Sequence, residues 1–183
     1  MQKIPTLFVR DETKPGHPVM DVVKPECQWV LTGEGTPTEK VDGTNVKIED
    51  GRLYKRQKPR DRDYDAASYV ECERGNPADR WAWEGFDRIN GAQLVGSLIG
   101  ELIGPKVQGN PYGHTMHTIV PVVPPSRVLH IVVLADRRFE ALRVFLAANQ
   151  MEGIVFHHPD GRLAKIKRRD FGLPWPGVGG GDV

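Results

Sequence analysis

Two Asp-Gly dipeptides constrain the fold most strongly, because each separates two segments with the alternation expected of β-strands. Asp50-Gly51 lies between TEKVDGTNVKIE and RLYKR, and Asp160-Gly161 lies between MEGIVFHH and RLAKIKR. Asp and Gly tolerate the positive φ angles that a tight hairpin turn needs. The sequence therefore predicts two β-hairpins, one in each half of the chain.

Other segments carry helical or buried-strand signals. In DRRFEALRVFLAANQ the apolar residues follow helical spacing, with Asp136 as the expected N-cap. NPADRWAWEGFDRIN predicts a second helix with Pro77 in its first turn. VLHIVVLA, residues 128–135, predicts a buried strand. Helices inserted between hairpins favour an α+β fold with antiparallel sheets.

Length and composition are those of a soluble globular chain. The chain has 183 residues, of which 39% are hydrophobic and 27% charged. We expect one domain over residues 1–172 and an irregular Gly/Pro-rich tail over 173–183. The start lacks the apolar stretch of a signal peptide, no apolar run is long enough to span a bilayer, and the two cysteines lack metal or redox spacing. These features predict a cytoplasmic protein without a membrane contact.

Basic residues gather in two places although the net charge is only +1. The first cluster is RLYKRQKPRDR, residues 52–62, and the second holds Lys165, Lys167, Arg168 and Arg169. Such clusters favour contact with a polyanion, and a solvated face is the alternative.

Lys40, in TEKVDGTN, is a candidate nucleophile. A lysine is normally protonated and attacks only where burial or other cations depress its pKa. Lys165 and Lys167 are suitable cations, because residues two apart on a strand project to the same face. Glu101 and Glu152 each stand beside a glycine, and carboxylates near lysines at a phosphate imply a divalent metal.

Each motif alone is weak, but their order along the chain is specific. KVDGTN, YKR, GELIGP, EGIVF and AKIKR follow one another from Lys40 to Arg169. This order resembles the covalent nucleotidyltransferase superfamily, and within it the ATP-dependent RNA ligases in a minimal single-domain form. The resemblance implies an α+β nucleotidyltransferase (ATP-grasp-like) domain whose antiparallel sheets are flanked by helices, without an appended OB or C-terminal domain.

The resemblance also implies roles for individual residues. Lys40 would attack the α-phosphate of ATP to form lysyl-N-AMP, and Lys165 and Lys167 would bind that phosphate. Glu39 would contact the adenine, and Arg56 would lie near the ribose and the transferred phosphate. Asp42, Glu101 and Glu152 would hold Mg²⁺ or Mn²⁺. Glu152 therefore counts among the catalytic residues, and Glu101 also among those that bind the nucleotide.

Two departures from the family pattern bear on these roles. Ligases of this kind stack an aromatic residue on the adenine, and His130 is the nearest candidate here. A histidine satisfied within the core is the preferred interpretation of His130. Without a second domain, RNA binding is expected to fall to Arg52, Lys55, Lys58, Arg60 and Arg62, to Arg168-Arg169, or to a partner protein.

Alternative interpretations stay open. A zinc site from His114, His117, His157 and His158 is disfavoured, since no cysteine is near. Trp81 and Trp83 are expected in the core, with base stacking as the alternative. The function expected is an RNA ligase, active in RNA repair, that joins 5′-phosphate and 3′-hydroxyl ends. The alternatives are a DNA ligase, a capping-type nucleotidyltransferase, a glycoside hydrolase using Glu101 and Glu152, and a non-catalytic RNA-binding module.

Overall fold

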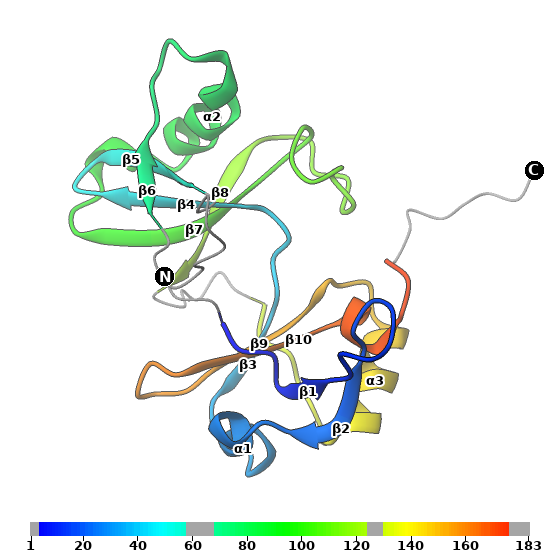
Figure 1. Cartoon of the computed structure of the whole chain (residues 1–183). Coiled ribbons are helices and arrows are strands. Elements are labelled where there is room, and N and C mark those ends of the chain that lie inside the picture. The colour runs from blue at the N-terminus through cyan, green and yellow to red at the C-terminus, as the bar shows by residue number, and fades with distance from the viewer. Residues whose placement is uncertain (1–3, 58–67, 124–129, 176–183) are drawn as a thin grey trace, which may run out of the picture. The chain divides into compact units, whose positions relative to one another are not determined.

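A computed structural model describes residues 4–57, 68–123 and 130–175, and the chain forms two compact units (Figure 1). Of the described residues, the central unit comprises 42–57 and 68–123, and the terminal unit comprises 4–41 and 130–175. From residue 4 the described chain runs through the terminal unit, enters the central unit at residue 42 and is back in the terminal unit from residue 130. Whether residues 1–172 act as one nucleotidyltransferase domain stays a prediction.

The central unit is built on a five-stranded sheet with the strand order β6-β5-β4-β7-β8. All its neighbouring strands are antiparallel. Its first hairpin turns at Asp50 and Gly51, whose φ angles are 46° and 75°, so the prediction for this Asp-Gly pair is confirmed. The strands are β4 (Thr44–Glu49), β5 (Arg52–Arg56), β6 (Tyr69–Glu71), β7 (Ser97–Ile103) and β8 (Thr118–Val123).

One face of this sheet is packed against helix α2 (Arg80–Arg88). Phe86 of α2 belongs to the same buried cluster as Val46, Ile48 and Leu53. The helix is preceded by the 3-10 turn η2 (Pro77–Asp79), where the Asn76 side chain accepts a hydrogen bond from the Ala78 amide. The predicted helix is therefore confirmed, although Pro77 lies in the 3-10 turn before it. A further 3-10 turn, η3 (Gly91–Gln93), leads toward β7.

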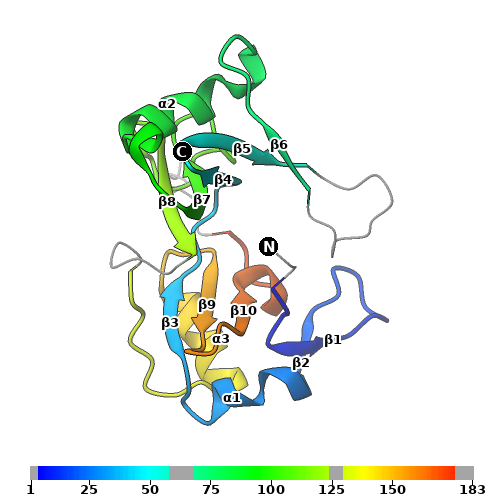
Figure 2. The same cartoon turned by 90° about the vertical axis from the view of Figure 1, so that its left-hand side faces the viewer.

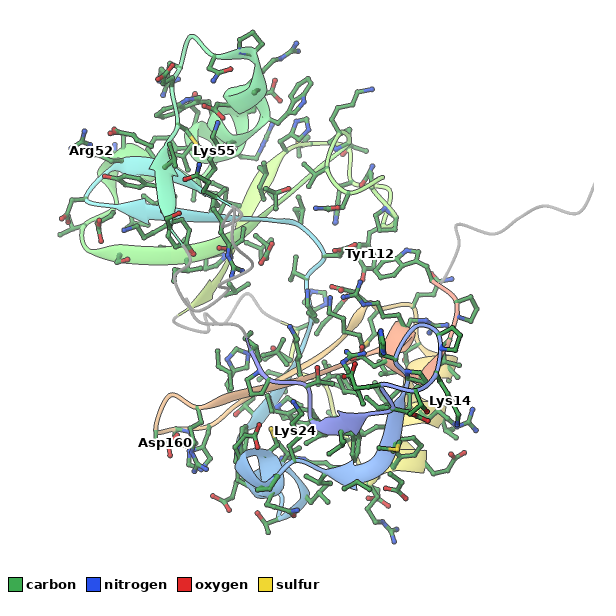
Figure 3. All side chains as sticks on the ribbon, viewed as in Figure 1. Lys14, Lys24, Arg52, Lys55, Tyr112 and Asp160 are labelled. Carbon is green, nitrogen blue, oxygen red and sulfur yellow. The ribbon has the colours of Figure 1, made fainter. Side chains whose placement is uncertain are left out.

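The terminal unit holds a three-stranded antiparallel sheet with the order β10-β9-β3 (Figure 2). The second predicted hairpin is confirmed, because Leu163 pairs with His157 and Lys167 pairs with Gly153. Asp160 lies at the tip of this hairpin (Figure 3). The strands are β3 (Thr36–Glu39), β9 (Gly153–His157) and β10 (Leu163–Lys167).

Helix α3 (Phe139–Ala148) covers one face of the three-stranded sheet. Its Leu142 and Leu146 are fully buried with Ile154 and Phe156 of β9. A small sheet of β1 (Phe8–Arg10) and β2 (Val19–Val23) adds Phe8 and Val19 to this core. The remaining elements are η1 (Pro25–Cys27), α1 (Gln28–Leu31) and η4 (Arg168–Phe171). The α+β class with antiparallel sheets is confirmed.

Two local predictions are wrong. Residues 130–135 do not form a buried strand, since Ile131 and Val133 are 69% and 87% exposed and only Val132 is buried. The segment makes one isolated bridge to β3, at Thr38, and only Val132 and the partly buried Leu134 contact the core. Asp136 is not the N-cap of α3, because the helix begins at Phe139 and Asp136 accepts a bond from the Arg138 amide before it.

Within the part of the chain that the structure describes, no helix is both long and apolar enough to span a membrane.

Candidate active site

Three lysines gather around one buried carboxylate in the terminal unit. Lys40 follows β3, and its amide donates to the Gly153 carbonyl across a distance of 2.9 Å. Lys167 is the register partner of the same glycine on the other side of β9. Glu152 immediately precedes Gly153, so the backbone places its carboxylate between two lysines that are 127 positions apart in the sequence.

The Glu152 carboxylate bridges the two amines. Its Oε2 lies 2.6 Å from Lys40 Nζ, and its Oε1 accepts a hydrogen bond from Lys167 Nζ. Burial opposes ionisation of Glu152, but Lys40 and Lys167 outweigh it and the pKa of this carboxyl is lowered. A buried carboxylate with two cationic partners stays charged and holds both amines in place.

Lys165 is the third amine of this group. It lies two residues before Lys167 on β10, where Ala164 and Ile166 point into the core, so both lysines share the opposite face. Burial, reinforced by the charges of Lys167 and Lys40, lowers the pKa of Lys165 to about 8. The pKa of Lys167 is lowered as well, by burial and by Lys40. The charges of neighbouring lysines thus lower the pKa of Lys165 and of Lys167.

Gly153 permits the close spacing of these strands. An added Cβ would lie 2.2 Å from the Ile166 carbonyl oxygen and 2.9 Å from the Lys167 Cα. Those atoms belong to the backbone of β10, so they cannot move aside independently. A glycine after Glu152 is therefore required for the lateral contact with Lys167.

Glu39, the last residue of β3, and His130 contact each other. The Glu39 amide donates to the His130 carbonyl, and the two side chains approach to 3.5 Å. The register pairs Glu39 with Ile154, which places it on the face of the sheet opposite to Lys165. The His130 side chain is 84% exposed, so the preferred interpretation of a core histidine is wrong. Ile131, the next residue in the chain, is also exposed, so this segment lies at the surface.

In the central unit, Glu101 belongs to a hydrogen-bonded row across the sheet. Tyr69 Oη donates to Asn45 Oδ1 at 2.6 Å, and Asn45 Nδ2 donates to Glu101 Oε1 at 3.2 Å. Burial raises the pKa of Tyr69, Arg56 opposes that rise and Glu101 adds to it, so the phenol remains a donor. Arg56 is the register partner of Tyr69 and therefore lies on the same face. Asn45 and Tyr69 therefore orient Glu101, and the sequence motifs did not predict this contact.

Asp42 stands at the start of the central unit, directly before a glycine that packs on β7. A Cβ on Gly43 would lie 2.9 Å from the Cβ of Glu101 and 2.4 Å from the Leu102 carbonyl oxygen. The backbone after Asp42 thus runs against Glu101, and two of the three predicted metal ligands belong to one region. Glu152, the third, belongs to the other unit, and the described residues contain no group of three His, Cys, Asp or Glu side chains placed to hold an ion.

The structure describes two members of the predicted nucleic-acid track, and their RNA binding stays a prediction. Arg52 and Lys55 lie on opposite faces of β5 and both are paired (Figure 3). Arg52 makes a two-pronged contact with Glu71, and Lys55 pairs with the buried Asp79 at the start of α2. The sequence prediction did not take into account that alternate residues of a strand point to opposite faces. Lys58, Arg60 and Arg62 lie outside the described residues.

Arg168 is also unsuited to RNA binding. It is buried, and its guanidinium donates to the carbonyls of Leu146, Asn149 and Pro174. These contacts tie η4 to the end of α3. Arg169 is exposed and remains a candidate.

The histidines weighed as zinc ligands have other contacts. Buried His117 binds Glu84 through Nδ1 at 2.7 Å and stacks on Trp81. His157 shares a hydrogen bond with Thr38, and burial lowers its pKa. His158 lies between Glu34 and Asp160. Trp81 and Trp83 are partly buried against the central core, in agreement with the core interpretation.

Three residues of the site region were not singled out from the sequence. Asn45 stands within the first motif, so its position was a usable signal, whereas Tyr69 has no motif around it. Asp170 follows the last motif and is fully buried beneath Lys167. Its position three residues after Lys167 was therefore also a usable signal.

Comparison with known proteins relates this geometry to a family. The family model for RNA ligase 1 matches residues 91–180, a stretch that contains Glu101, Glu152, Lys165 and Lys167 but not Lys40. RNA ligase 1 of Danio rerio is 40% identical over 84 residues, which cover 42% of this chain and 25% of that protein. RNA ligase 1 of Pongo abelii is 33% identical over 84 residues with the same coverage. The match thus spans a quarter of the length of these relatives.

Solved structures support the same relation through the fold. A variant of the Naegleria gruberi RNA ligase with ATP and Mn aligns with a TM-score of 0.52 at 15% identity, over 91% of this chain and 58% of that one. A second variant of that ligase, without ligands, gives a TM-score of 0.51 over the same shares of both chains. In sequence and in fold, this chain is related to the RNA ligases, as the order of its motifs predicted.

Proposed function

We propose that this chain is the adenylyltransferase part of an ATP-dependent RNA ligase, with Lys40 as its nucleophile. The observation that carries the proposal is the bridge from Lys40 through Glu152 to Lys167, with Lys165 on the same face of the sheet. Two further observations support it. The relatives are named as RNA ligases, and the aligned Naegleria structure holds ATP and Mn.

The proposed reaction begins with attack on ATP. The Lys40 amine loses a proton and forms a bond from Nζ to the α-phosphorus, while the bond to pyrophosphate breaks. The carboxylate of Glu152, 2.6 Å from Nζ, is the acceptor within reach of that proton. Lys165 and Lys167 bear the positive charge that a phosphate in transfer requires, and positioning with charge neutralisation is the main demand of this chemistry.

The proposed donors are amines for a nucleotide phosphate and carboxylates for a divalent ion. Lys165 is a largely buried amine to which no described carboxylate is bonded, so a phosphate oxygen would satisfy it. Asp42, Glu101 and Glu152 are the oxygen ligands that would hold Mg²⁺ or Mn²⁺, and the ion when bound would neutralise charge on the phosphate. Glu39 and His130 are the proposed contacts to the adenine, and Arg56 to the ribose.

Two more steps complete the proposed cycle. AMP passes from Lys40 to the 5′-phosphate of RNA, and a 3′-hydroxyl then attacks that phosphate with release of AMP. RNA with these ends is therefore the proposed substrate, with repair of broken RNA in the cytoplasm as the proposed setting. Because the chain matches only part of its relatives, a partner protein or another segment is a further proposed source of RNA contacts.

Covalent labelling tests the proposal. The protein incubated with α-labelled ATP and Mg²⁺ or Mn²⁺ should acquire an acid-labile AMP adduct, and Lys40→Ala should abolish it. Lys14→Ala is the matched control, since Lys14 is an exposed lysine of the same unit. Equal labelling of Lys40→Ala and wild type would defeat the proposal. A glycoside hydrolase or a non-catalytic RNA-binding module would give no adduct, and labelling from GTP alone would favour a capping-type enzyme. Joining of DNA ends but not RNA ends would favour a DNA ligase.

A further inference from the structure

A buried ion pair lies directly behind the lysines of β10. Asp170 is fully buried in η4, and its Oδ1 lies 2.5 Å from a guanidinium nitrogen of Arg10. Its other oxygen accepts a hydrogen bond from the Lys167 amide at 2.9 Å. One carboxylate therefore connects the N-terminal β1 strand with the last residue of β10.

Arg10 is itself held by three contacts. Besides Asp170, it donates to the His17 carbonyl at 2.8 Å and to Thr6 Oγ1 at 3.4 Å. These acceptors lie on both sides of β1, so the guanidinium braces the whole N-terminal hairpin. A forked cation of this kind fixes the orientation of the carboxylate that it binds.

The same N-terminal segment also binds the backbone at Lys165. The Leu7 amide donates to the Lys165 carbonyl at 2.8 Å, and the Lys165 amide donates to the Pro5 carbonyl at 2.9 Å. Residues 5–7 thus run along the free edge of β10. Leu7 and Phe8 are fully buried in the core of the unit, so this edge contact is firmly anchored.

Asp170 also acts on Lys165 through its charge. Burial and the cations Lys167 and Lys40 lower the pKa of Lys165, whereas Asp170 and Glu152 oppose that shift. The charges around Lys165 and Lys167 are therefore Lys40, Glu152, Asp170 and Arg169, with Arg10 bound to Asp170. Glu152 is already shared between Lys40 and Lys167, so Asp170 is the carboxylate left to balance Lys165.

We propose that Arg10 and Asp170 are positioning residues that fix the end of β10 and supply the negative charge facing Lys165. The N-terminal segment would then be part of the machinery that holds the phosphate-binding lysines, although neither residue touches the nucleotide. The catalytic role of this pair rests on the proposed function, whereas its effect on the position and protonation of the lysines does not.

The two members of the pair make opposite predictions. Asp170→Asn keeps one of the two acceptor oxygens and removes the charge, so Lys165 should lose its proton at lower pH. Arg10→Met removes the cation that neutralises Asp170, so Lys165 should lose its proton at higher pH. Opposite-charge effects of this type amount to about one pH unit. A merely structural role would not give shifts of opposite sign.

The measurement is the pH dependence of acetylation of each lysine by acetic anhydride, followed by mass spectrometry of the folded protein. Arg143→Met, which removes an exposed arginine paired with Glu140 on α3, is the matched control and should leave the Lys165 midpoint unchanged. Circular dichroism verifies the fold of each variant. If one variant fails to fold, the sign of the shift in the other decides.

Shifts in the same direction, or no shift in a folded variant, would overturn the inference. The pH profile of AMP-adduct formation should move with the Lys165 midpoint in both variants. The two proposals fail separately, because a wild-type protein without an adduct defeats the proposed function but leaves the acetylation test intact. An adduct whose pH profile is unchanged in Asp170→Asn defeats the positioning role alone.

Discussion

The two sheets present polar faces of different chemistry. In the terminal unit, the face bearing Lys165 and Lys167 holds cations around Glu152, and burial depresses their protonation. In the central unit, the face bearing Asn45 and Glu101 holds a row of hydrogen bonds that ends in a carboxylate. The first arrangement is suited to attack on a phosphate, and the second to orienting a ligand or an ion.

The charge cluster and the row of hydrogen bonds should respond differently to the loss of one side chain. A buried charge cluster is sensitive to the loss of any member, because the remaining charges lose their compensation. A row of hydrogen bonds between partly exposed side chains tolerates loss better, since water can replace a missing partner. Mutations in the terminal-unit face should therefore have larger effects on stability and on adduct formation than mutations in the central-unit face.

The largest effect is expected at Glu152. Glu152→Gln leaves Lys40 and Lys167 without their shared carboxylate, so AMP-adduct formation should fall by about 100-fold or more, in line with the loss of a preorganised charge in an active site. The free energy of unfolding should fall by about 3 kcal/mol, because a buried ionic group loses its partner. Adduct assays and chemical denaturation measure the two effects. Glu140→Gln, an exposed carboxylate on α3, is the control, and equal behaviour of both variants would contradict the role of the bridge.

Replacement of Lys165 should stabilise the protein while it impairs the reaction. The folded-state pKa of about 8 lies below the ordinary value of 10.5, so the unfolded chain binds more protons between these values. Stability should therefore rise with pH from about 8 to 10.5, and Lys165→Met should remove that rise. At pH 7 the variant should gain on the order of 2 kcal/mol. Urea unfolding across this pH range checks the sign, with Lys14→Met as control. A wild-type protein of constant stability over that range would contradict the depressed pKa.

A smaller effect is expected in the central unit. Asn45→Ala removes the group between Tyr69 and Glu101, so Glu101 loses its orientation but keeps its charge. Adduct formation should fall by about tenfold, corresponding to one charged hydrogen bond. Tyr69→Phe should cost less, because Asn45 still reaches Glu101. A rate assay at several ATP concentrations measures both, and a loss as large as that of Glu152→Gln would show that the two faces do not differ as proposed.

The smallest effect is expected at Arg52. Its contact with Glu71 is solvent-exposed, and exposed pairs contribute little. Arg52→Ala should leave Tm and AMP-adduct formation unchanged within measurement. RNA joining should also keep its salt dependence, because one paired surface arginine releases few counterions. A clear drop in the salt slope would restore Arg52 to the RNA-binding surface.

Local signals decided much of the fold. Asp50-Gly51 and Asp160-Gly161 predicted both hairpins because turn chemistry acts between neighbouring residues. The spacing of Lys165 and Lys167 predicted a shared face, since alternation along a strand is a backbone property. The residues of the family motifs could likewise be found in order, although their catalytic roles stay proposals.

The errors share one cause, which is that burial depends on what packs against a segment. Residues 130–135 are apolar enough for a core strand, yet the edge of β3 accepts only one bridge and leaves Ile131 exposed. Lys55 looked like a surface cation, but strand alternation turns it toward Asp79. Arg168 looked like an RNA ligand and is instead buried among carbonyl groups of the C-terminal segments.

The sequence by itself determined the hairpins, the α+β class and the relation to the RNA ligases, because these follow from residues close in the chain or from motifs in a fixed order. Only the tertiary structure decided that Glu152 bridges Lys40 and Lys167, and that Arg10 reaches Asp170 from 160 positions away. Such contacts depend on the register of strands and on the closure of long loops. Their energies are electrostatic and fall off with distance in space, which residue order does not specify.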